Sequence, residues 1–394
     1  MNNNGKKYKI VYITPSLYVA GGVERVLTLK ANYFADILGY DITIILTDGF
    51  GKKLFYPISD KVKVVNLNIE FEDIMSCSFF KKVFIYLKKQ HRFKKILKRV
   101  LLNIAPDITV TLMRREINFI NAIKDGSKKI GEIHVNRSNY RNFESNESNF
   151  IKRIFSYFWM RNLYTKIKRL DKFVVLTNED LKQWGQMDNI VTIPDPLAFF
   201  PVESSHLTKK RIIAIGRYTY QKGFDLLIKA WSLIENEYPE WGLTIYGQGD
   251  RVQYETLIAN LGVSPHRCIL LPQTSDVIKE LLDSSIFAFS SRFEGFGMVL
   301  IEAMSCGLPV VSFDCPCGPK DIIGDAVDGF LVPNGNVEKL AEGLSKLMND
   351  ELLRIKMGKA ARENVKRYNL ENIALKWQVL FDEVCNTNTS KTVS

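Results

Sequence analysis

Short apolar runs separated by helix-length segments make up most of the first half of this chain. The segment Val23–Leu38, which follows the first of these runs, has the length and spacing of a helix. Strand-like runs that alternate with helices predict a parallel sheet covered on both faces. The strand-like runs are Lys9–Thr14, Asp41–Leu46, Val62–Leu67, Ile108–Leu112 and Phe173–Leu176.

The same alternation restarts in the second half of the chain, so we expect a second parallel sheet there. Its strand-like runs are Arg211–Ile215, Leu243–Tyr246, Ile269–Leu271, Ile286–Phe289, Val310–Phe313 and Leu331–Pro333. Its helix-like segments are Phe224–Ile234, Arg251–Leu261, Met298–Ser305 and Val337–Met348. A last amphipathic helix, Leu370–Val384, carries Trp377 and Phe381.

A proline-rich stretch interrupts the alternation between the two halves. Residues 193–210 hold Pro194, Pro196 and Pro201, which favour a linker. At 394 residues the chain is long enough for two domains. We therefore predict an α/β protein with two doubly wound domains, residues 1–195 and 196–370, followed by a C-terminal helix and polar tail at residues 371–394. Two such domains facing each other would hold a ligand in the cleft at the carboxyl ends of their strands.

The formal net charge of +11 is concentrated in the first half. Nine Lys or Arg residues and no acidic residue occur between Lys81 and Arg99, next to apolar residues at helical spacing. The stretch Ile151–Leu170 mixes basic with aromatic residues. Each stretch alone is equally consistent with an ordinary amphipathic helix. Together they favour an anionic membrane surface over nucleic acid, for which no module pattern is present.

No apolar run approaches the roughly 20 residues that span a bilayer. The N-terminus has no apolar h-region of a signal peptide. We therefore expect a cytoplasmic protein that is peripheral on the inner face of the cell membrane.

Two carboxylates, Glu294 and Glu302, flank the glycine-bearing turn that joins a predicted strand to a predicted helix. Backbone N–H groups at such a turn suit a phosphate or sugar hydroxyls, and we expect Phe296, Gly297 and Met298 to supply them. Either acid alone is consistent with a helix cap or a surface residue.

Two cations lie near another predicted helix start, at Gly216-Arg217 and Lys222-Gly223. Cations at a helix N-terminus repel the helix dipole, so stability does not explain them. A diphosphate between Arg217 and Lys222 would explain them. Two solvated surface cations are the competing interpretation.

Two features of the first half are weaker by themselves. Gly21-Gly22 follows the first strand, where a glycine pair is usually a tight turn. His134 lies at a predicted strand end, where a lone histidine is more often structural than catalytic.

These motifs, in this order, resemble the Glu-x7-Glu signature and associated loops of glycosyltransferase family 4, the retaining nucleotide-sugar transferases. The resemblance covers roughly residues 8–385 and implies the GT-B fold, with the C-terminal helix packing back on the first domain. It implies that Gly21 and Gly22 approach the donor phosphates, that Arg217 and Lys222 clamp the diphosphate, and that His134 faces the reacting centre. Glu294 would contact the transferred sugar, and Glu302 the ribose. Arg137 could meet an acceptor phosphate.

The resemblance further implies transfer of a hexose or N-acetylhexosamine from a nucleotide-diphosphate sugar, with a UDP-sugar the commonest donor. The acceptor would be a lipid-diphosphate-linked saccharide in the synthesis of bacterial capsule, O-antigen or a related polysaccharide. We expect no cofactor and no metal ion, because cations and helix N-termini can stabilise the departing diphosphate.

Four alternatives compete with this hypothesis. A glycosidase would use Glu294 and Glu302 as its acid and nucleophile but leaves Arg217 and Lys222 unexplained. A dehydrogenase would need a third glycine after Gly247-x-Gly249. A nucleotide-sugar 2-epimerase of the same fold would not need the basic stretches. A non-catalytic membrane-surface adaptor would not need the carboxylates and cations.

Overall fold

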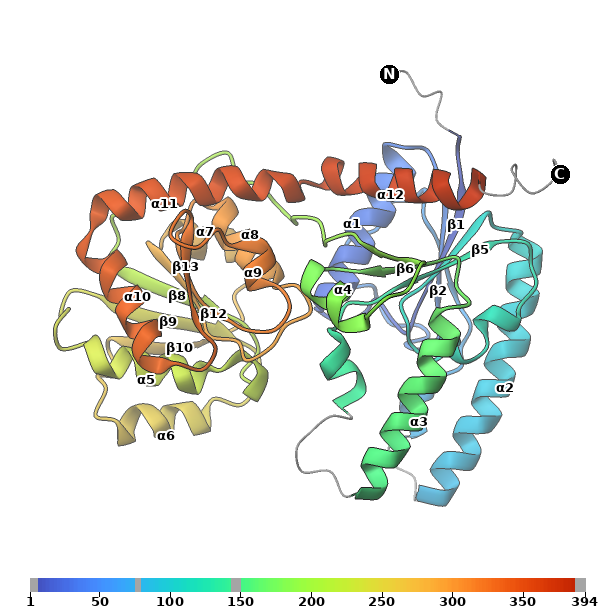
Figure 1. Ribbon diagram of the computed structural model, residues 1–394, viewed down its shortest axis with the longest axis horizontal. Coiled ribbons are helices and arrows are strands. Elements are labelled where there is room, and N and C mark those ends of the chain that lie inside the picture. The colour runs from blue at the N-terminus through green and yellow to red at the C-terminus, as the bar shows by residue number, and fades with distance from the viewer. Residues whose placement is uncertain (1–5, 75–78, 143–149, 387–394) are drawn as a thin grey trace. The chain divides into compact units, whose positions relative to one another are not determined.

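The computed structural model describes residues 6–74, 79–142 and 150–386 (Figure 1). The chain divides into two compact units. The first unit comprises Met1–Leu176, Asp180–Pro196 and Leu370–Ser394, and the second comprises Thr177–Glu179 and Leu197–Asn369. The units divide after Pro196 and after Asn369, and the predicted domains divide after residues 195 and 370. The short segment Thr177–Glu179 belongs to the second unit.

The first unit is built on one seven-stranded parallel sheet with the order β3-β2-β1-β4-β5-β6-β7. Chain connections run outward in opposite directions from β1 and β4, so the topological switch point lies between these two strands. The strands are β1 (Lys9–Thr14), β2 (Asp41–Leu46), β3 (Lys63–Asn66), β4 (Ile108–Thr111), β5 (Lys128–Glu132), β6 (Lys172–Val175) and β7 (Ile190–Thr192).

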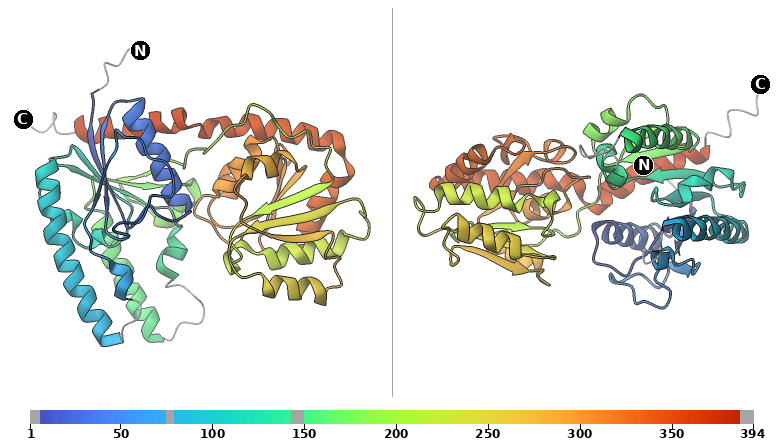
Figure 2. Two further views of the ribbon diagram at one scale, coloured as in Figure 1. Left: turned by 180° about the vertical axis from the view of Figure 1, so that it is seen from behind. Right: turned by 90° about the horizontal axis from the view of Figure 1, so that it is seen from below.

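Helices cover both faces of this sheet (Figures 1 and 2). They are α1 (Gly22–Asp36), α2 (Phe79–Ile104), α3 (Phe150–Ile167), α4 (Asn178–Trp184) and α12 (Leu370–Asn386). Short 3-10 turns are η1 (Phe71–Ile74), η2 (Glu116–Asn118), η3 (Ile120–Ala122) and η4 (Arg137–Asn142). Buried strand residues such as Val11 and Phe173 pack against Phe93 and Leu97 of α2 in one continuous core. This double cover explains why the strands read as unbroken apolar runs.

Two strands, β5 and β7, were absent from the predicted runs. β5 has the sequence Lys-Lys-Ile-Gly-Glu, in which polar residues hide the strand pattern. Its Lys129 and Glu132 are nevertheless buried, because Asp125 lies 2.5 Å from the Lys129 ammonium and Lys30 pairs with Glu132. β7 is only three residues long. Ion pairs that form in the tertiary structure therefore allow a strand that its composition does not predict.

The C-terminal helix α12 packs on the first unit, as the resemblance implied. Phe381 is fully buried and its ring lies 5.8 Å from that of Phe34 on α1 and 6.3 Å from that of Tyr8. The Tyr8 hydroxyl donates to Asp382 at 2.5 Å. A chain that has crossed into the second unit therefore ends as part of the core of the first.

The second unit contains a six-stranded parallel sheet with the order β10-β9-β8-β11-β12-β13. Its switch point lies between β8 and β11, which repeats the topology of the first unit. The strands are β8 (Arg211–Ile215), β9 (Gly242–Gly247), β10 (Cys268–Pro272), β11 (Ile286–Phe289), β12 (Val310–Asp314) and β13 (Gly329–Pro333).

The helices of the second unit are α5 (Phe224–Ile234), α6 (Val252–Asn260), α7 (Val277–Leu282), α8 (Met298–Ser305), α9 (Pro319–Ile322), α10 (Val337–Asn349) and α11 (Glu351–Asn364), with the 3-10 turns η5 (Tyr220–Lys222) and η6 (Val365–Tyr368). The sequence pattern did not predict α11, which is rich in charge. Its Arg354 is 1% exposed because the guanidinium donates to the carbonyls of Leu347 and Met348 at the end of α10.

Leu380 and Leu375 provide a matched test of how α12 packs, because Leu380 is buried and Leu375 is 59% exposed on the same helix. We expect Leu380→Ala to lower the free energy of unfolding by about 2–5 kcal/mol and Leu375→Ala by less than about 0.5 kcal/mol. Denaturant unfolding of both variants measures this difference. Equal losses would contradict the packing of α12 on the first unit.

Candidate active site

The predicted donor residues of the second unit lie in the loops that follow β8 and β11, on either side of its switch point. Lys222 ends η5 after β8, and Glu294 lies between β11 and α8. The Lys222 ammonium is 2.7 Å from a Glu294 carboxylate oxygen, and their side chains are only 15% and 8% exposed. The structure therefore brings these two residues together as a largely buried ion pair.

Two glycines, Gly216 and Gly223, allow Lys222 to lie close to Glu294. A Cβ at Gly216 would lie 3.1 Å from the aliphatic chain of Lys222. Gly223 has a φ of +61°, and a Cβ there would lie 2.0 Å from the carbonyl oxygen of Ser290. The Ser290 hydroxyl in turn donates to the Lys222 carbonyl at 2.9 Å. Only glycine allows the two loops to approach this closely.

A second contact between the same loops was not anticipated from the sequence. Arg292 donates to both carboxylate oxygens of Asp225, at 2.8 and 2.7 Å. Burial raises the pKa of Asp225, but the bond and charge of Arg292 outweigh it and lower that pKa. The Arg292 backbone N–H also donates to Gln221 at 2.8 Å. The sequence shows Asp225 at the start of a predicted helix. It does not show that Asp225 pairs with Arg292, because Arg292 is 67 residues away along the chain.

Arg217 is exposed, and its guanidinium lies 3.5 Å from the Gln221 side-chain oxygen. Lys222 pairs with Glu294. The diphosphate clamp formed by Arg217 and Lys222 therefore stays a prediction.

The start of α8 has the geometry that the signature predicted. Gly297 has a φ of +99° and precedes Met298, the first residue of α8. Phe296 is buried against the ring of Tyr368, at 5.4 Å between centroids. Glu302 lies in the second turn of α8 and is only 5% exposed. A helix start offers N–H groups without partners inside the helix, which suits an anion or hydroxyl ligand.

Gly247 and Gly249, the glycines that suggested a dehydrogenase, have a packing role. A Cβ at Gly247 would lie 2.2 Å from the carbonyl oxygen of Gly216, and one at Gly249 would lie 3.1 Å from that of Tyr218. They let the end of β9 approach the loop that carries Lys222. Because packing explains both glycines, they give no support to the dinucleotide-binding motif of a dehydrogenase.

In the first unit, Gly21 and Gly22 lie between β1 and α1. Gly22 is the first residue of α1, one residue before the predicted start, and Gly21 precedes it in an extended conformation. A Cβ on Gly21 would collide with the Glu24 side chain, whereas nothing lies within 4 Å of one on Gly22. Their approach to donor phosphates stays a prediction.

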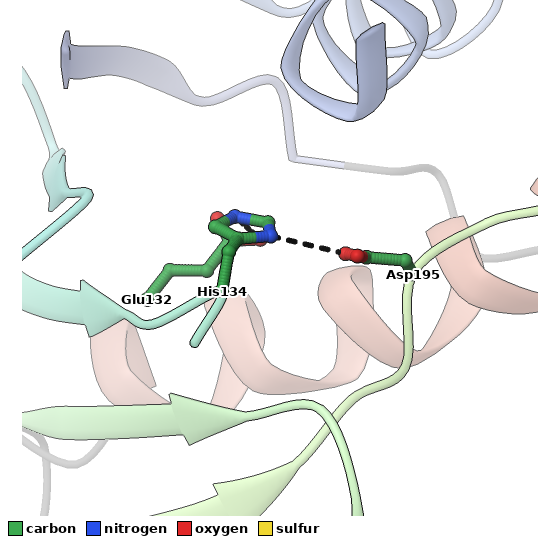
Figure 3. Close-up of side chains that lie close together, drawn as sticks. All are labelled: Glu132, His134 and Asp195. Atoms are coloured by element: carbon green, nitrogen blue, oxygen red, sulfur yellow. Dashed lines mark ion pairs between the residues drawn. The ribbon is translucent and has the colours of Figure 1, made fainter. Parts of the chain in front are cut away.

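His134 lies two residues beyond β5, near the carboxyl edge of the first sheet, and contacts two carboxylates (Figure 3). Its Nε2 is 3.2 Å from Glu132 Oε1, and its Nδ1 is 3.4 Å from Asp195 Oδ1. Neither contact has the alignment of a hydrogen bond. Lys30 of α1 pairs with the same Glu132 carboxylate. All of these side chains are at least 93% buried.

The pKa shifts in this cluster follow from these charges. Burial lowers the pKa of His134, but the carboxylates of Asp195 and Glu132 outweigh it and raise the pKa to about 9. Burial raises the pKa of Glu132, but Lys30 and His134 outweigh it and lower the pKa to about 2. Near neutral pH, His134 is therefore protonated and Glu132 is ionised.

Sequence reasoning identified His134 but missed its three partners. Lys30 interrupts the apolar face of α1, Glu132 lies between Gly131 and Ile133 at the end of β5, and Asp195 lies between Pro194 and Pro196. A charge inside an apolar run signals a buried partner. The pattern does not say which charges meet, because they come from three separate segments.

The loop after β4 is held in an unusual conformation by buried polar groups. Met113 is fully buried with a φ of +56°, a region that non-glycine residues seldom adopt. The Tyr140 hydroxyl donates to its carbonyl. The buried Glu116 accepts from the Thr111 hydroxyl and from the Arg114 backbone at 3.0 Å. Such enforced strain occurs mainly at functional sites.

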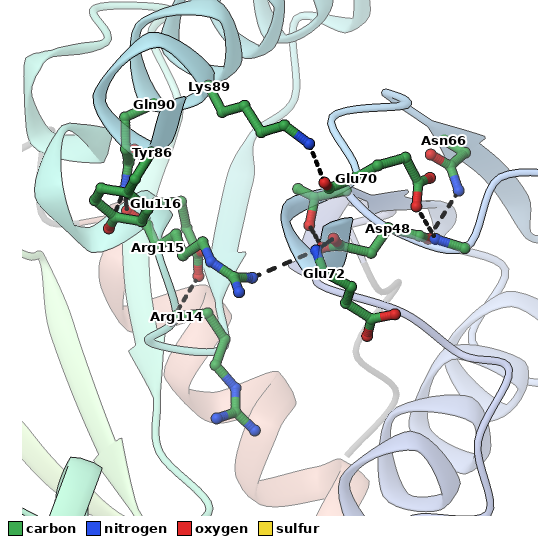
Figure 4. Close-up of polar contacts among 12 residues, drawn as sticks. Asp48, Asn66, Glu70, Glu72, Tyr86, Lys89, Gln90, Arg114, Arg115 and Glu116 are labelled. Atoms are coloured by element: carbon green, nitrogen blue, oxygen red, sulfur yellow. Dashed lines mark hydrogen bonds and ion pairs between the residues drawn. The ribbon is translucent and has the colours of Figure 1, made fainter. Parts of the chain in front are cut away.

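Two arginines leave this loop in different directions (Figure 4). Arg115 lies 3.7 Å from the buried carboxylate of Asp48, and its guanidinium stacks over Phe71 at 4.4 Å. Arg114 points away from that network and is exposed. Arg137, the predicted acceptor residue, donates to the Tyr164 hydroxyl at 2.8 Å. Arg137 therefore already has a structural contact, and its role toward an acceptor stays a prediction.

Two hollows differ in their relation to these residues. A groove of about 430 Å³ lies between α5 and α10, and no predicted site residue lines it. A much smaller hollow in the first unit is lined by His134, Arg114, Tyr140 and Val23, among others. His134 and Arg114 thus line the smaller hollow of the first unit, whereas the larger groove of the second unit is lined by residues other than the predicted donor residues.

The basic segments of the first half form α2 and α3. On α2, the apolar face predicted from Phe93, Leu97 and Leu101 is fully buried in the core. This apolar face therefore packs in the core, as expected for an ordinary amphipathic helix. Phe84 and Leu87, nearer the start of α2, are 71% and 61% exposed.

Tyr157 and Phe158 of α3 are also largely exposed. The side chains of Lys152, Arg153 and Phe155, which contributed to the basic and aromatic pattern, lie outside the described residues. No helix in the described parts of the chain is long and apolar enough to span a membrane.

The chain is similar to known glycosyltransferases in both sequence and fold. Residues 198–364 match the family model described as Glycosyl transferases group 1. An uncharacterised glycosyltransferase of Haemophilus influenzae is 28% identical over 376 residues, covering 94% of this chain and 99% of that protein. The crystal structure of a variant of S. aureus TarM, in complex with fondaparinux, alpha-GlcNAc-glycerol and UDP, aligns with a TM-score of 0.73. The alignment covers 95% of this chain and all of that one, at 19% identity.

A further relative is similar over a shorter region. The N-acetylgalactosamine-N,N'-diacetylbacillosaminyl-diphospho-undecaprenol 4-alpha-N-acetylgalactosaminyltransferase of Campylobacter jejuni is 30% identical over 174 residues, which cover 44% of this chain and 47% of that protein. The chain is a glycosyltransferase with the GT-B fold, and residues 198–364 of its second unit are similar to the group 1 glycosyl transferases.

The raised pKa of His134 predicts how stability depends on pH. A folded pKa of about 9 against an unfolded value of about 6.5 gives stability that is complete below about pH 6.5 and lost as pH rises through 9. We expect the melting temperature to fall by roughly 3–8 °C over that range. His134→Gln should flatten this slope, whereas His91→Gln, at an exposed site on α2, should not. If the melting temperature falls equally with pH in the wild type and in both variants, His134 does not carry the stabilising charge.

Proposed function

We propose that this protein is a retaining glycosyltransferase of family 4. It moves a hexose or N-acetylhexosamine from a nucleotide-diphosphate sugar, in particular a UDP-sugar, to a hydroxyl of a lipid-linked saccharide. The observation that carries the proposal is the Lys222–Glu294 pair at the switch point of the second sheet, beside the start of α8. Ligands of open α/β sheets bind at such switch points.

The donor assignment follows from the chemistry of these loops. A departing diphosphate needs cations and N–H donors, which Lys222, Arg217 and the start of α8 can supply. A transferred sugar needs strong acceptors for its hydroxyls, which Glu294 can supply. Glu302, buried in α8, is our proposed acceptor for the ribose hydroxyls. The UDP in the TarM complex supports a uridine nucleotide.

The reaction breaks the bond between the anomeric carbon and the diphosphate oxygen and forms a bond to the acceptor oxygen. The electron pair of the broken bond goes to the diphosphate oxygen, so negative charge develops on the leaving group. That oxygen then takes the proton of the acceptor hydroxyl. Lys222 is held by Glu294 and by the loop contact at Gly223, so its ammonium needs little reorganisation to meet that charge. We propose that this stabilisation makes the enzyme independent of metal ions.

The acceptor is proposed to be a saccharide linked to a lipid diphosphate, in the assembly of a bacterial surface polysaccharide such as capsule or O-antigen. The Campylobacter relative is named for a diphospho-undecaprenol acceptor, which supports this class. In the first unit, Arg114 and Arg137 are cations at the carboxyl edge of the sheet. Either can pair with a phosphate group.

We further propose that the protein works at the inner face of the cell membrane. Phe84 and Leu87 of α2 are exposed, and Lys81 and Lys88 beside them are exposed cations. Apolar residues flanked by lysines favour the interface of an anionic bilayer. A lipid-linked acceptor would be presented at that surface.

A screen of nucleotide sugars tests the proposed reaction. Purified protein would be mixed with UDP-, GDP- and ADP-sugars in the presence of EDTA, and both the melting temperature and nucleotide release would be measured. We expect stabilisation by one nucleotide class and slow release of its diphosphate without metal. Release of a free 2-epimer would support the epimerase, and silence from a folded protein that binds liposomes would support the adaptor.

Two variants test the donor residues. Lys222→Ala should lower kcat by about 100-fold or more, because it removes a charge opposite the leaving group. Glu302→Ala should weaken nucleotide binding by about tenfold, because one charged hydrogen bond is lost. The controls Lys320→Ala and Glu363→Ala change exposed residues of the same unit. Unchanged turnover in Lys222→Ala would contradict its assigned role.

Flotation with vesicles containing phosphatidylglycerol tests the membrane surface. Leu87→Ser should reduce binding about tenfold, because a leucine side chain no longer enters the interface. Leu102→Ser, at a half-exposed position near the end of the same helix, should not reduce binding. If both variants bind vesicles equally well, the region around Leu87 does not bind the membrane.

A further inference from the structure

The imidazole of His134 has a carboxylate at each of its two nitrogens (Figure 3). Nε2 lies 3.2 Å from Glu132 and Nδ1 lies 3.4 Å from Asp195. A neutral imidazole carries one N–H and one lone pair, so one of these nitrogens would hold a lone pair within 3.4 Å of a buried carboxylate oxygen. Both contacts are attractive only when the ring carries two protons. The arrangement therefore favours the imidazolium.

The surrounding charges also balance only with an imidazolium. Lys30 from α1 pairs with Glu132, and its ammonium lies 4.4 Å from the Trp377 ring of α12 and 5.9 Å from the Tyr12 ring of β1. With Lys30 and His134 charged against Glu132 and Asp195, the cluster is neutral. Loss of the His134 proton would leave a net negative charge in a site that excludes water, which is costly.

A metal ion fits this donor set less well. The ligand atoms of Glu132, His134 and Asp195 lie within 4.8 Å of one another. However, the two carboxylates approach opposite nitrogens of one ring, and a single ion can bind only one of these nitrogens. Lys30 already occupies Glu132, and a divalent ion would add positive charge beside its ammonium. The geometry suits a proton on each nitrogen.

The neighbouring segments fix this cluster in place. His134 also lines the small hollow that contains Arg114 and Tyr140. Pro194 and Pro196 restrict the backbone on both sides of Asp195. Asp195 lies one residue before Pro196, where this segment of the first unit ends. The ring is thus held both by charge and by a stiff backbone.

We propose that Glu132 and Asp195 are positioning residues that hold His134 as an imidazolium, so that His134 supplies a fixed positive charge and not a base during glycosyl transfer. This inference rests on the proposed function, because it gives His134 a part in the proposed glycosyl transfer. The proton of the acceptor hydroxyl goes to the diphosphate oxygen and not to His134. The imidazolium keeps both of its protons throughout.

The protonation state of His134 can be measured without any substrate. The full chain, labelled with ¹⁵N at its four histidines, would be titrated by NMR, with the His134 signals assigned from His134→Gln. We expect both ring nitrogens to stay protonated from about pH 6 to pH 8. A neutral tautomer at pH 7 would overturn the proposal. This measurement stands even if no sugar nucleotide is turned over.

Asp195→Asn tests the positioning role with little change in shape. We expect the His134 titration to move toward acid by about one to two pH units, because the amide no longer stabilises the charged ring. The alkaline limb of the kcat profile should move by the same amount, and Asp195→Glu should restore part of it. Asp41→Asn is the control, since Asp41 pairs with Lys63 at the surface of the same unit.

The outcomes separate this inference from the proposed function. A shifted titration with no turnover of any donor would support the imidazolium and reject the transferase assignment of the site. An unshifted titration in folded Asp195→Asn would reject the positioning role. If that variant does not fold, the wild-type titration still decides the protonation state.

Discussion

The parallel arrangement of strands is the constraint on which the rest of this structure depends. In each sheet, the connections run in opposite directions from one pair of strands, β1 and β4 in the first and β8 and β11 in the second. The loops at these points diverge, so a ligand can reach the strand ends between them. The Lys222–Glu294 pair lies on loops of this kind in the second sheet. His134 lies beyond β5, at the carboxyl edge of the first sheet.

Buried charge is the second theme that the two units share. The first unit balances Lys30 and His134 against two carboxylates, and the second pairs Lys222 with Glu294 and Arg292 with Asp225. Burying such groups costs free energy unless each charge has a partner. Their retention at the strand ends is therefore more consistent with a chemical role than with stability. A glycosyltransferase needs charge there, because its reaction separates a diphosphate from a sugar.

Most strands and helices could be predicted because the apolar pattern is local. The helix Met298–Ser305 and the strand Ile286–Phe289 were predicted with the bounds that the structure has. β5 and α11 were missed because polar residues in them are buried through partners far along the chain. The basic stripe of α2 was placed correctly, but only the structure shows that its apolar face is already used by the core.

The sequence by itself determined the two α/β units and the order of the motifs, because residue type and spacing carry that information. It also offered Lys222 and Glu294 as candidates, whereas His134 became one through the family resemblance. Only the tertiary structure decided that Lys222 meets Glu294 and that Asp195 and Glu132 enclose His134. The physical reason is that these contacts join segments far apart in the chain. Hydrophobic periodicity fixes what is buried, whereas charge pairing depends on which segments the folded backbone brings together.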